Sequence, residues 1–112
     1  MSAFQLYQGA TYKLPIKLNI DGQTVTEKDV ARVDFIFGTL IKSYPQNADC
    51  ITCEDGVFTV SLTCKDTAQI PAPKQWHLQA KVTFNDGSVK PSKCTPFFMN
   101  STHFPKEVTA NE

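Results

Sequence analysis

The sequence predicts an all-β fold in which short antiparallel strands form two sheets packed face to face. Apolar and polar residues alternate along Tyr12–Ile20 and again along Trp76–Phe84, which places one set of side chains on each face of a strand. Asp21, Asp55 and Asp86 each precede a glycine, and Asp-Gly pairs readily adopt the positive φ angles of tight hairpin turns. About seven to eight short strands, with turn signals every 8 to 12 residues or so, favour an immunoglobulin-like sandwich.

The N-terminal part of the chain predicts two strands and one helical turn. Phe4–Tyr7 forms the first strand and Tyr12–Ile20 the second. Pro15 lies on the polar face of the second strand and has no N–H to donate, so we expect this strand at a sheet edge or with a bulge. Thr26–Asp29 has capping-box spacing, which predicts one helical turn running through Val30 and Ala31.

The middle of the chain predicts three strands and a second helical turn. Residues 32–44 are rich in β formers, with Gly38 marking a bulge or a bend. A short strand at residues 49–53 leads into a hairpin and then into the alternating strand at residues 58–62. Thr63–Asp66 has capping-box spacing, so we expect a helical turn that ends near Gln69 across one end of the sandwich.

Trp76–Phe84 is the clearest strand, and the rest of the chain is expected to supply strands that cover Trp76. On this expectation Trp76→Ala unfolds the domain, at a cost of about 3 to 5 kcal/mol. Short strands at residues 88–90 and 94–99 follow the Asp86-Gly87 turn. The sandwich is expected to span residues 1–104, and residues 105–112 are expected to form a flexible tail.

Charge and hydropathy exclude several classes of partner. The chain has 112 residues, and its 11 basic residues balance its 11 acidic ones, so no basic patch is expected to attract nucleic acid. No apolar run approaches the roughly 20 residues that span a bilayer. The first residues lack the features of a signal peptide, which predicts a protein made in a cytoplasm, with no membrane partner.

The four cysteines do not favour a metal or redox site. Cys50 and Cys53 have C-x-x-C spacing, but a structural zinc would also need Cys64 and Cys94, which belong to no second such pair. A thioredoxin-like site would place the motif at a helix N-terminus, and here it lies between turn residues and a strand. We expect Cys64 and Cys94 to be small core or edge residues, and we expect no metal and no cofactor.

The sequence favours a protein that is not an enzyme. Nucleophilic catalysis needs a base beside a serine or cysteine, and the two histidines lie on the polar face of a strand, His77, and near the C-terminus, His103. The glycines are isolated and form no phosphate-binding loop. Sugar binding on an exposed aromatic residue, at Tyr44 or at Phe97–Phe98, remains an alternative.

Adjacent apolar residues within strands point to an interaction surface. Neighbouring strand residues face opposite sides of a sheet, so one of Phe97 and Phe98 must point away from the core. Ile36, between Phe35 and Phe37, follows the same rule. Apolar side chains on an outer face mark a surface that a partner covers. We therefore take Ile36, Phe97, Phe98 and Phe104 as interface candidates.

The order of these motifs resembles a family of small phage and prophage structural proteins from Gram-positive gut bacteria, which includes domains like the N-terminal domain of baseplate upper proteins. The resemblance covers most of the chain and rests on five segments: Tyr7–Gly9, Asp21–Thr26, Val33–Gly38, Gly56–Thr67 and Gln79–Gly87. The four cysteines and the extension at residues 100–112 depart from the pattern and leave room for a different attachment role.

The resemblance implies a virion protein without catalytic residues. It would be an immunoglobulin-like module of a tail, baseplate or fibre attachment, made in the bacterial host and present in several copies that contact other virion proteins. A capsid decoration protein and a carbohydrate-binding module for host surface glycans are the alternatives. A zinc-dependent protein would require the four cysteines to converge.

Overall fold

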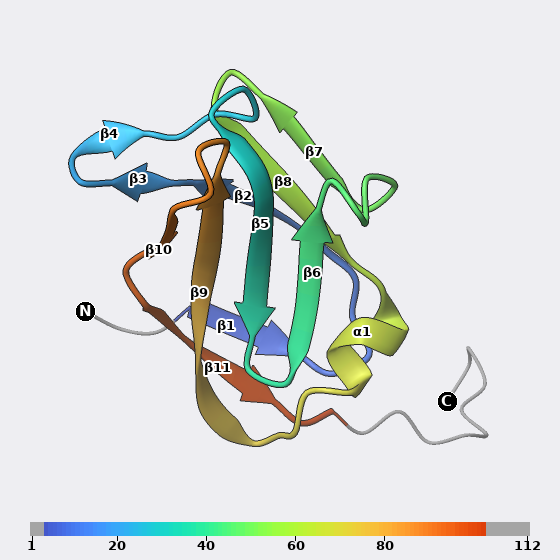
Figure 1. The fold of residues 1–112 in the computed structure, drawn as a ribbon. Helices are drawn as coiled ribbons and strands as arrows, with labels where there is room; N and C mark the ends of the chain where they lie inside the picture. Colours follow the sequence, from blue (N-terminus) through green and yellow to red (C-terminus); the bar gives the residue numbers. More distant parts are fainter. Residues whose placement is uncertain (1–3, 103–112) are drawn as a thin grey trace.

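The structure is a computed structural model and describes residues 4–102. The chain folds into two β-sheets that face each other, with a short hairpin projecting from one end (Figure 1). Expectations for His103, for Phe104 and for the tail at residues 105–112 lie outside the described residues. No helix in the described part of the chain has the length and hydropathy needed to cross a membrane.

The larger sheet has six strands, and all of its pairings are antiparallel except that of β1 with β11. β10 (Val89–Pro91) and β11 lie along the same side of β9, with a break between them. The other strands follow the order β1 (Phe4–Tyr7), β11 (Thr95–Asn100), β9 (Lys74–Phe84), β5 (Val30–Phe37) and β6 (Leu40–Tyr44).

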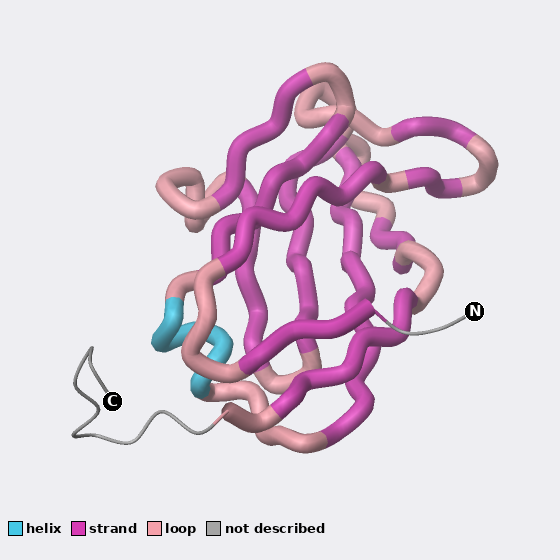
Figure 2. The backbone as a smooth tube through the Cα atoms, turned by 180° about the vertical axis from the view of Figure 1, so that it is seen from behind, coloured by secondary structure: helices cyan, strands magenta, loops and turns pink. Residues whose placement is uncertain are grey.

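The smaller sheet has three antiparallel strands in the order β2 (Tyr12–Lys17), β8 (Val57–Leu62) and β7 (Ile51–Glu54). β3 (Asn19–Ile20) and β4 (Gln23–Thr24) form the projecting hairpin. α1 (Cys64–Ala68) packs at the opposite end of the sandwich (Figure 2). The predicted antiparallel two-sheet sandwich is therefore confirmed, and β2 with Pro15 lies at a sheet edge.

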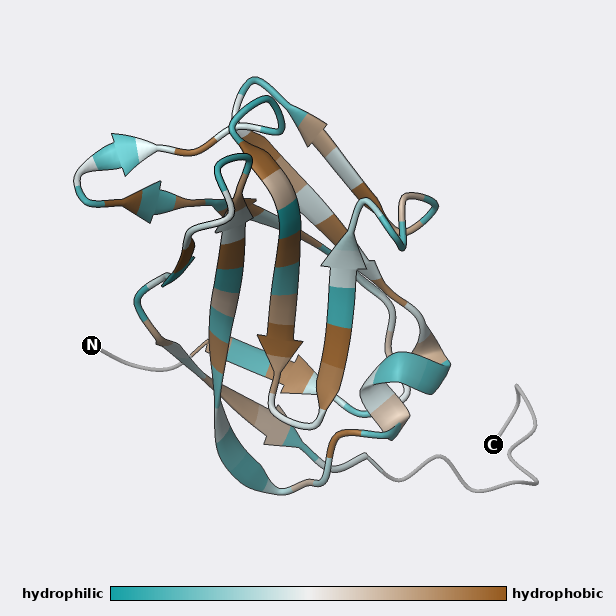
Figure 3. Cartoon of the chain, viewed as in Figure 1, coloured by the Kyte–Doolittle hydropathy of each residue, from teal (hydrophilic) through white to brown (hydrophobic). Residues whose placement is uncertain are grey.

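β9 carries the alternation that the sequence predicts. Leu78, Ala80 and Val82 are buried against the other sheet, whereas His77 and Lys81 are exposed on the outer face. Figure 3 shows the same banding of hydrophobic and hydrophilic residues along β9 and β5. β9 is paired to β5 along most of its length, so both strands share one register and one buried face.

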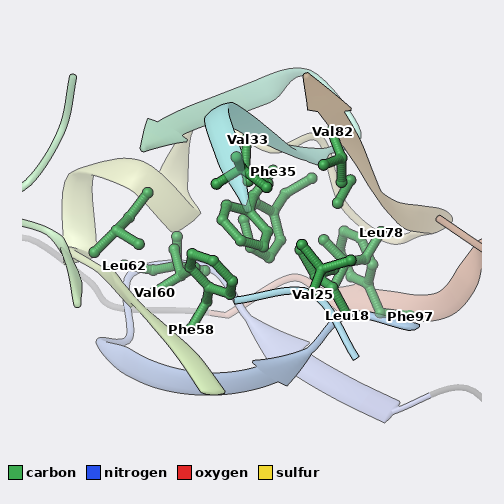
Figure 4. Packing of buried hydrophobic residues seen from close by; sticks show 14 of the residues in the cluster. Leu18, Val25, Val33, Phe35, Phe58, Val60, Leu62, Leu78, Val82 and Phe97 are labelled. Carbon is green, nitrogen blue, oxygen red and sulfur yellow. The ribbon is translucent and has the colours of Figure 1, made fainter. Parts of the chain in front are cut away.

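The core is built around phenylalanines from both sheets. The rings of Phe35 in β5 and Phe58 in β8 lie 5.7 Å apart across the sandwich. Phe97 in β11 packs 5.5 Å from Phe4 and 6.4 Å from Phe37. Figure 4 shows this cluster between the sheets. Aromatic pairs at such distances add about 0.5 to 1.5 kcal/mol beyond their buried area, so these contacts help to fix how the sheets face each other.

The expectation that other strands cover Trp76 is met only in part. Trp76 lies near the start of β9, where it is half-buried and packs against the core cluster. Its Nε1 donates a hydrogen bond of 2.9 Å to the carbonyl of Pro71, and Lys74 Nζ lies 4.3 Å from its ring centroid. Gly38 lies in the turn between β5 and β6, where its φ is 63° and a Cβ would meet the Trp76 ring at 2.7 Å.

One of the two expected helical turns forms. The Thr63 hydroxyl accepts from the N–H of Asp66 at 3.1 Å and the Asp66 carboxylate accepts from the N–H of Thr63 at 2.8 Å, which completes the capping box of α1. Thr26 and Asp29 make the same kind of contact at 2.9 Å, but Val30 already begins β5. The predicted helical turn through Val30 and Ala31 is wrong, because pairing with β9 holds these residues extended.

An ion pair joins α1 to the edge of the larger sheet. Lys42 Nζ in β6 lies 3.0 Å from Asp66 Oδ2, and both side chains are close to nine-tenths buried. Burial raises the pKa of Asp66, but hydrogen bonds from the Thr63 N–H, Lys42 and the Thr63 hydroxyl, together with the Lys42 charge, lower it overall. A carboxylate with a depressed pKa stabilises the folded state wherever it is ionised.

Gly38→Ala tests the contact with Trp76. Alanine at a positive φ costs about 1 to 2 kcal/mol, and crowding against the ring adds about 1 to 3 kcal/mol. Gly22→Ala is the matched control, because Gly22 has a φ of 81° in another hairpin and nothing within 4 Å of its Cβ position. Urea unfolding is expected to show a larger loss of stability for Gly38→Ala. Equal losses would contradict the contact.

Asp66→Asn tests how the stability supplied by the ion pair between α1 and β6 depends on pH. Because the pKa of Asp66 is depressed below 3.8 in the folded state, its contribution is present near neutral pH and lost as the pH falls below about 4. The variant is therefore expected to lose about 1 to 2 kcal/mol at pH 7 and less at pH 3. Asp49→Asn, at an exposed turn residue, is the control for chemical unfolding at both pH values. An equal loss for Asp66→Asn at both pH values would contradict the account.

Candidate protein-interaction surface

The outer face of the six-stranded sheet, hereafter the outer face, collects the exposed large hydrophobic residues of the described chain. Tyr7, Ile41 and Val89 are 47%, 57% and 51% exposed. Tyr7 lies opposite Asn100 in the β1–β11 pair, and Val89 lies opposite Thr83 in the β10–β9 pair. The strand registers place all three side chains on the side of the sheet away from the core.

The outer side of the smaller sheet is different in character. Its strands turn Lys13, Thr52, Thr59 and Ser61 outward, since their neighbours along each strand line the core. Pro15 and Val57 add small apolar areas there. The outer face of the larger sheet carries large exposed apolar side chains among its polar ones, whereas the outer side of the smaller sheet is mostly polar, so the outer face is the one better suited to a protein partner.

Two of the residues singled out from the sequence lie on the outer face. Ile36 in β5 pairs with Ile41 of β6 on one side and with Gln79 of β9 on the other. Phe98 in β11 lies between Gln5 of β1 and Gln75 of β9. Both Ile36 and Phe98 are half-buried, so their sheet neighbours cover part of each side chain and leave part open to a partner.

Phe97 does not lie on this surface. It is fully buried, because it faces Trp76 across the β11–β9 pair on the inner side and packs between Phe4 and Phe37. The sequence rule that Phe97 and Phe98 face opposite sides is correct, and Phe98 is the outward member of the pair. Phe97 is therefore removed from the interface candidates, and Phe104 lies outside the described residues.

A polar cluster lies next to the Ile36–Ile41 pair. Asp34 Oδ1 accepts hydrogen bonds from the Ser43 hydroxyl at 2.6 Å and from Arg32 Nε at 2.8 Å. Burial raises the pKa of Asp34, but the bonds from Ser43 and Arg32 and the charges of Arg32 and Lys81 lower it overall. The outer face thus combines apolar side chains with a fixed carboxylate. In an interface, apolar side chains supply buried area and a fixed charge sets the orientation of the partner.

The break between β10 and β11 positions Val89. Ser92 donates its N–H to the Ala80 carbonyl at 2.8 Å, and its hydroxyl accepts from the Ala80 N–H at 2.9 Å. Gln79 Nε2 donates to the Ser92 carbonyl at 2.9 Å. These bonds keep the broken strand attached to β9, so Val89 stays on the same face as Ile36 and Phe98.

The cysteines form no cluster in the part of the chain that the structure describes. No group of three or more metal-ligand side chains comes together among residues 4–102. The sequence predicts that Cys64 and Cys94 are small core or edge residues; both are exposed, so the core alternative is wrong, and Cys64 begins α1 while Cys94 precedes β11. Burial, followed by a hydrogen bond to the Glu27 carboxylate, raises the pKa of the Cys53 thiol to about 11. A thiol with so high a pKa is a poor nucleophile near pH 7.

The residues considered for sugar binding do not form an open aromatic platform. Tyr44 packs edge-on against Phe58 at 5.5 Å, on the inner side of β6. Phe97 is buried, which leaves Phe98 alone. His77 is exposed on the polar face of β9, where the sequence places it.

Comparison with known proteins supports the fold class. A scan against protein-family models finds no match, and a search of curated proteins finds no significant match. Among solved structures, the chain is similar to the fibronectin(III)-like modules of Clostridium thermocellum CbhA, with 17% identity and a TM-score of 0.54. The match covers 90% of this chain and 43% of that chain, so this chain spans less than half of its length.

The chain is therefore an all-β protein with an immunoglobulin-like sandwich fold. At 17% identity the likeness concerns the fold alone. A sandwich of this kind serves many unrelated functions, so the role of this chain has to be argued from its surface.

Thiol labelling tests the cysteine environments. A thiol reagent at pH 8 is expected to modify Cys64 and Cys94 of the folded protein first, because both are exposed. Cys53 is expected to react at least ten times more slowly, because its raised pKa leaves little thiolate. Peptide mass spectrometry over time gives the order of labelling, and denatured protein is the control. Labelling of Cys53 as fast as Cys94 would contradict the environment described for it.

Proposed function

We propose that this chain is a non-enzymatic structural module that binds other protein subunits, including further copies of itself, through the outer face. The observation that carries the proposal is that Tyr7, Ile41 and Val89 are all exposed on that one face, which half-buried Ile36 and Phe98 share. Burial of apolar area is the main favourable term in most protein association, so a partner on this face gains more than one on the polar side.

The arrangement on the outer face resembles that of a protein interface. Ile36 and Ile41 lie next to polar residues that are already bonded within the fold, namely Asp34 with Ser43 and Arg32. Because these polar groups are bonded to one another, a partner covers them at a smaller cost than free polar groups would impose.

The specific role we propose is that of a structural or adaptor protein of a phage particle, in a tail, baseplate or fibre attachment. Support comes from the order of sequence motifs that resembles small phage structural proteins, and from a sandwich that exposes large apolar side chains on one outer face. This role predicts that the chain co-purifies with virions in a fixed multiple-copy ratio. Quantitative mass spectrometry of purified particles measures that ratio, and its absence from particles would contradict the role.

Substitutions on the outer face test the binding surface. Ile41→Asp combined with Phe98→Ser is expected to preserve folding, because neither side chain is part of the buried core. The mass of the purified full chain, measured by light scattering over a range of concentrations, is expected to rise for the wild type and to rise less for the variant. The physical reason is that a charge placed in an apolar contact must be desolvated without a partner.

A matched variant on the opposite side controls for surface charge. Thr59→Asp combined with Ser61→Asp places new charges on the outer side of β8 in the smaller sheet. These variants are expected to associate like the wild type. Equal association of all three proteins would show that the outer face is not the contact, and circular dichroism would verify that each is folded.

A further inference from the structure

A groove separates the two sheets along one side of the sandwich. Two adjoining cavities of about 650 and 520 Å³ form it, and both are lined by Ile20, Asp21 and Lys90. One wall is the segment from the end of β2 through the β3–β4 hairpin, and the other is β10 with the residues that follow it (Figure 1). We call this feature the β3–β10 groove.

The floor of the larger cavity is apolar. It is lined by Phe35, Leu78 and Ala80, which belong to the core between the sheets. The larger cavity therefore lies directly against the hydrophobic core, and an apolar side chain placed there would extend the core.

Each wall of the groove contains a strand with one unpaired edge. In residues 4–102, β2 pairs only with β8 and β10 pairs only with β9. Unpaired strand edges present rows of N–H and C=O groups that accept an additional strand. The shape therefore fits an extended segment that lies along one edge and directs alternate side chains to the floor.

The charges around the larger cavity favour an acidic segment. Lys17, Lys90 and Lys93 line it together with a single acidic residue, Asp21, which forms an ion pair with Lys90. Lys17 and Lys93 thus leave an excess of positive charge at the larger cavity, whereas the smaller cavity is also lined by Lys28, Asp29 and Asp86. An occupant with apolar residues on one face and a net negative charge would match both the apolar floor and the lysines that surround it.

The last ten residues of the chain have this character. In an extended segment Phe104, Val108 and Ala110 fall on one face with Lys106 and Glu112, while Glu107 falls on the other. Residues 103–112 contain two acidic residues, Glu107 and Glu112, and one basic residue, Lys106. We propose that the segment at residues 103–112 of one copy binds in the β3–β10 groove of a second copy as an added strand.

The reach of the chain favours a second copy over the same molecule. β11 runs from the groove at Thr95 to Asn100, so Thr102 lies about seven residues, or roughly 23 Å, along the chain from the groove wall. Ten residues span at most about 33 Å when extended. Returning to the groove would use about seven of them, which leaves too few to cover the floor. The segment of a neighbouring copy is not restricted by this length of chain.

The contact is head-to-tail, so each copy offers one groove and one segment. Such an interface forms a ring when the rotation between copies closes and an open filament when it does not. It is separate from the outer face, because neither Ile41 nor Phe98 lines the groove. The inference therefore adds a second mode of assembly to the proposed function.

Complementation between two full-length variants tests the inference. All samples carry Ile41→Asp, which removes the outer-face contact. The segment variant adds Phe104→Asp and Val108→Asp, and the groove variant adds Lys17→Glu and Lys93→Glu. Analytical ultracentrifugation is expected to show concentration-dependent oligomers for the Ile41→Asp parent and a monomer for each variant alone. An equimolar mixture is expected to form dimers and nothing larger, since each variant supplies one half of a single contact.

The control reverses two exposed lysines outside the groove, Lys13→Glu and Lys65→Glu, and is expected to associate like the parent. Variants that associate like the parent, or a mixture that stays monomeric, would overturn the inference. A third result would also overturn the inference. The parent would be a monomer, and substituting its segment at residues 103–112 would shift the amide signals of the groove in nuclear magnetic resonance spectra. The groove would then bind the segment of the same chain. None of these results depends on the outer face, so failure here leaves the proposed function to its own test.

Discussion

The register of β9 is the constraint on which the rest of the structure depends. β9 pairs with β5 on one side and with β10 and β11 on the other, so its alternation is transmitted across the larger sheet. A shift of one residue would bring Gln79 and Lys81 into the core and expose Ala80 and Val82. The same register sets Phe35 against Phe58 and keeps Ile36 outside, so core and outer face are fixed together.

Much of the fold follows from local patterns. Alternation and Asp-Gly turns identify the strands and hairpins around β2, β8 and β9, and the capping box identifies α1. Both errors concern residues whose structure depends on the arrangement of the sheet and not on the local sequence pattern. Thr26 and Asp29 form the local turn that their spacing predicts, but long-range pairing with β9 extends Val30 and Ala31 into a strand. Trp76 satisfies the alternation, yet its place near the end of β9 leaves it at the rim of the core.

The candidate surface was only partly predictable, because it depends on which strands become neighbours. Ile36 and Phe98 could be identified from alternation within a single strand. Tyr7 joins the surface only because β1 runs parallel to β11, and Val89 only because the bonds of Ser92 hold β10 against β9. Ile41 carries a usable local signal, since the hairpin at Gly38 places it directly opposite Ile36. The β3–β10 groove has no signal in any single strand.

The surfaces of the sandwich have different roles in this account. The smaller sheet completes the core and α1 packs at one end of the sandwich, whereas the larger sheet also presents apolar side chains to a partner. The most direct test of this claim measures solvent access to methyl groups with a soluble paramagnetic agent, at low and high protein concentration. The account predicts that the Ile41 methyl signals are relaxed in dilute protein and protected in concentrated protein, while those of Val57 on the opposite side do not change. Equal relaxation of Ile41 at both concentrations would contradict the assignment of the outer face as the contact between copies.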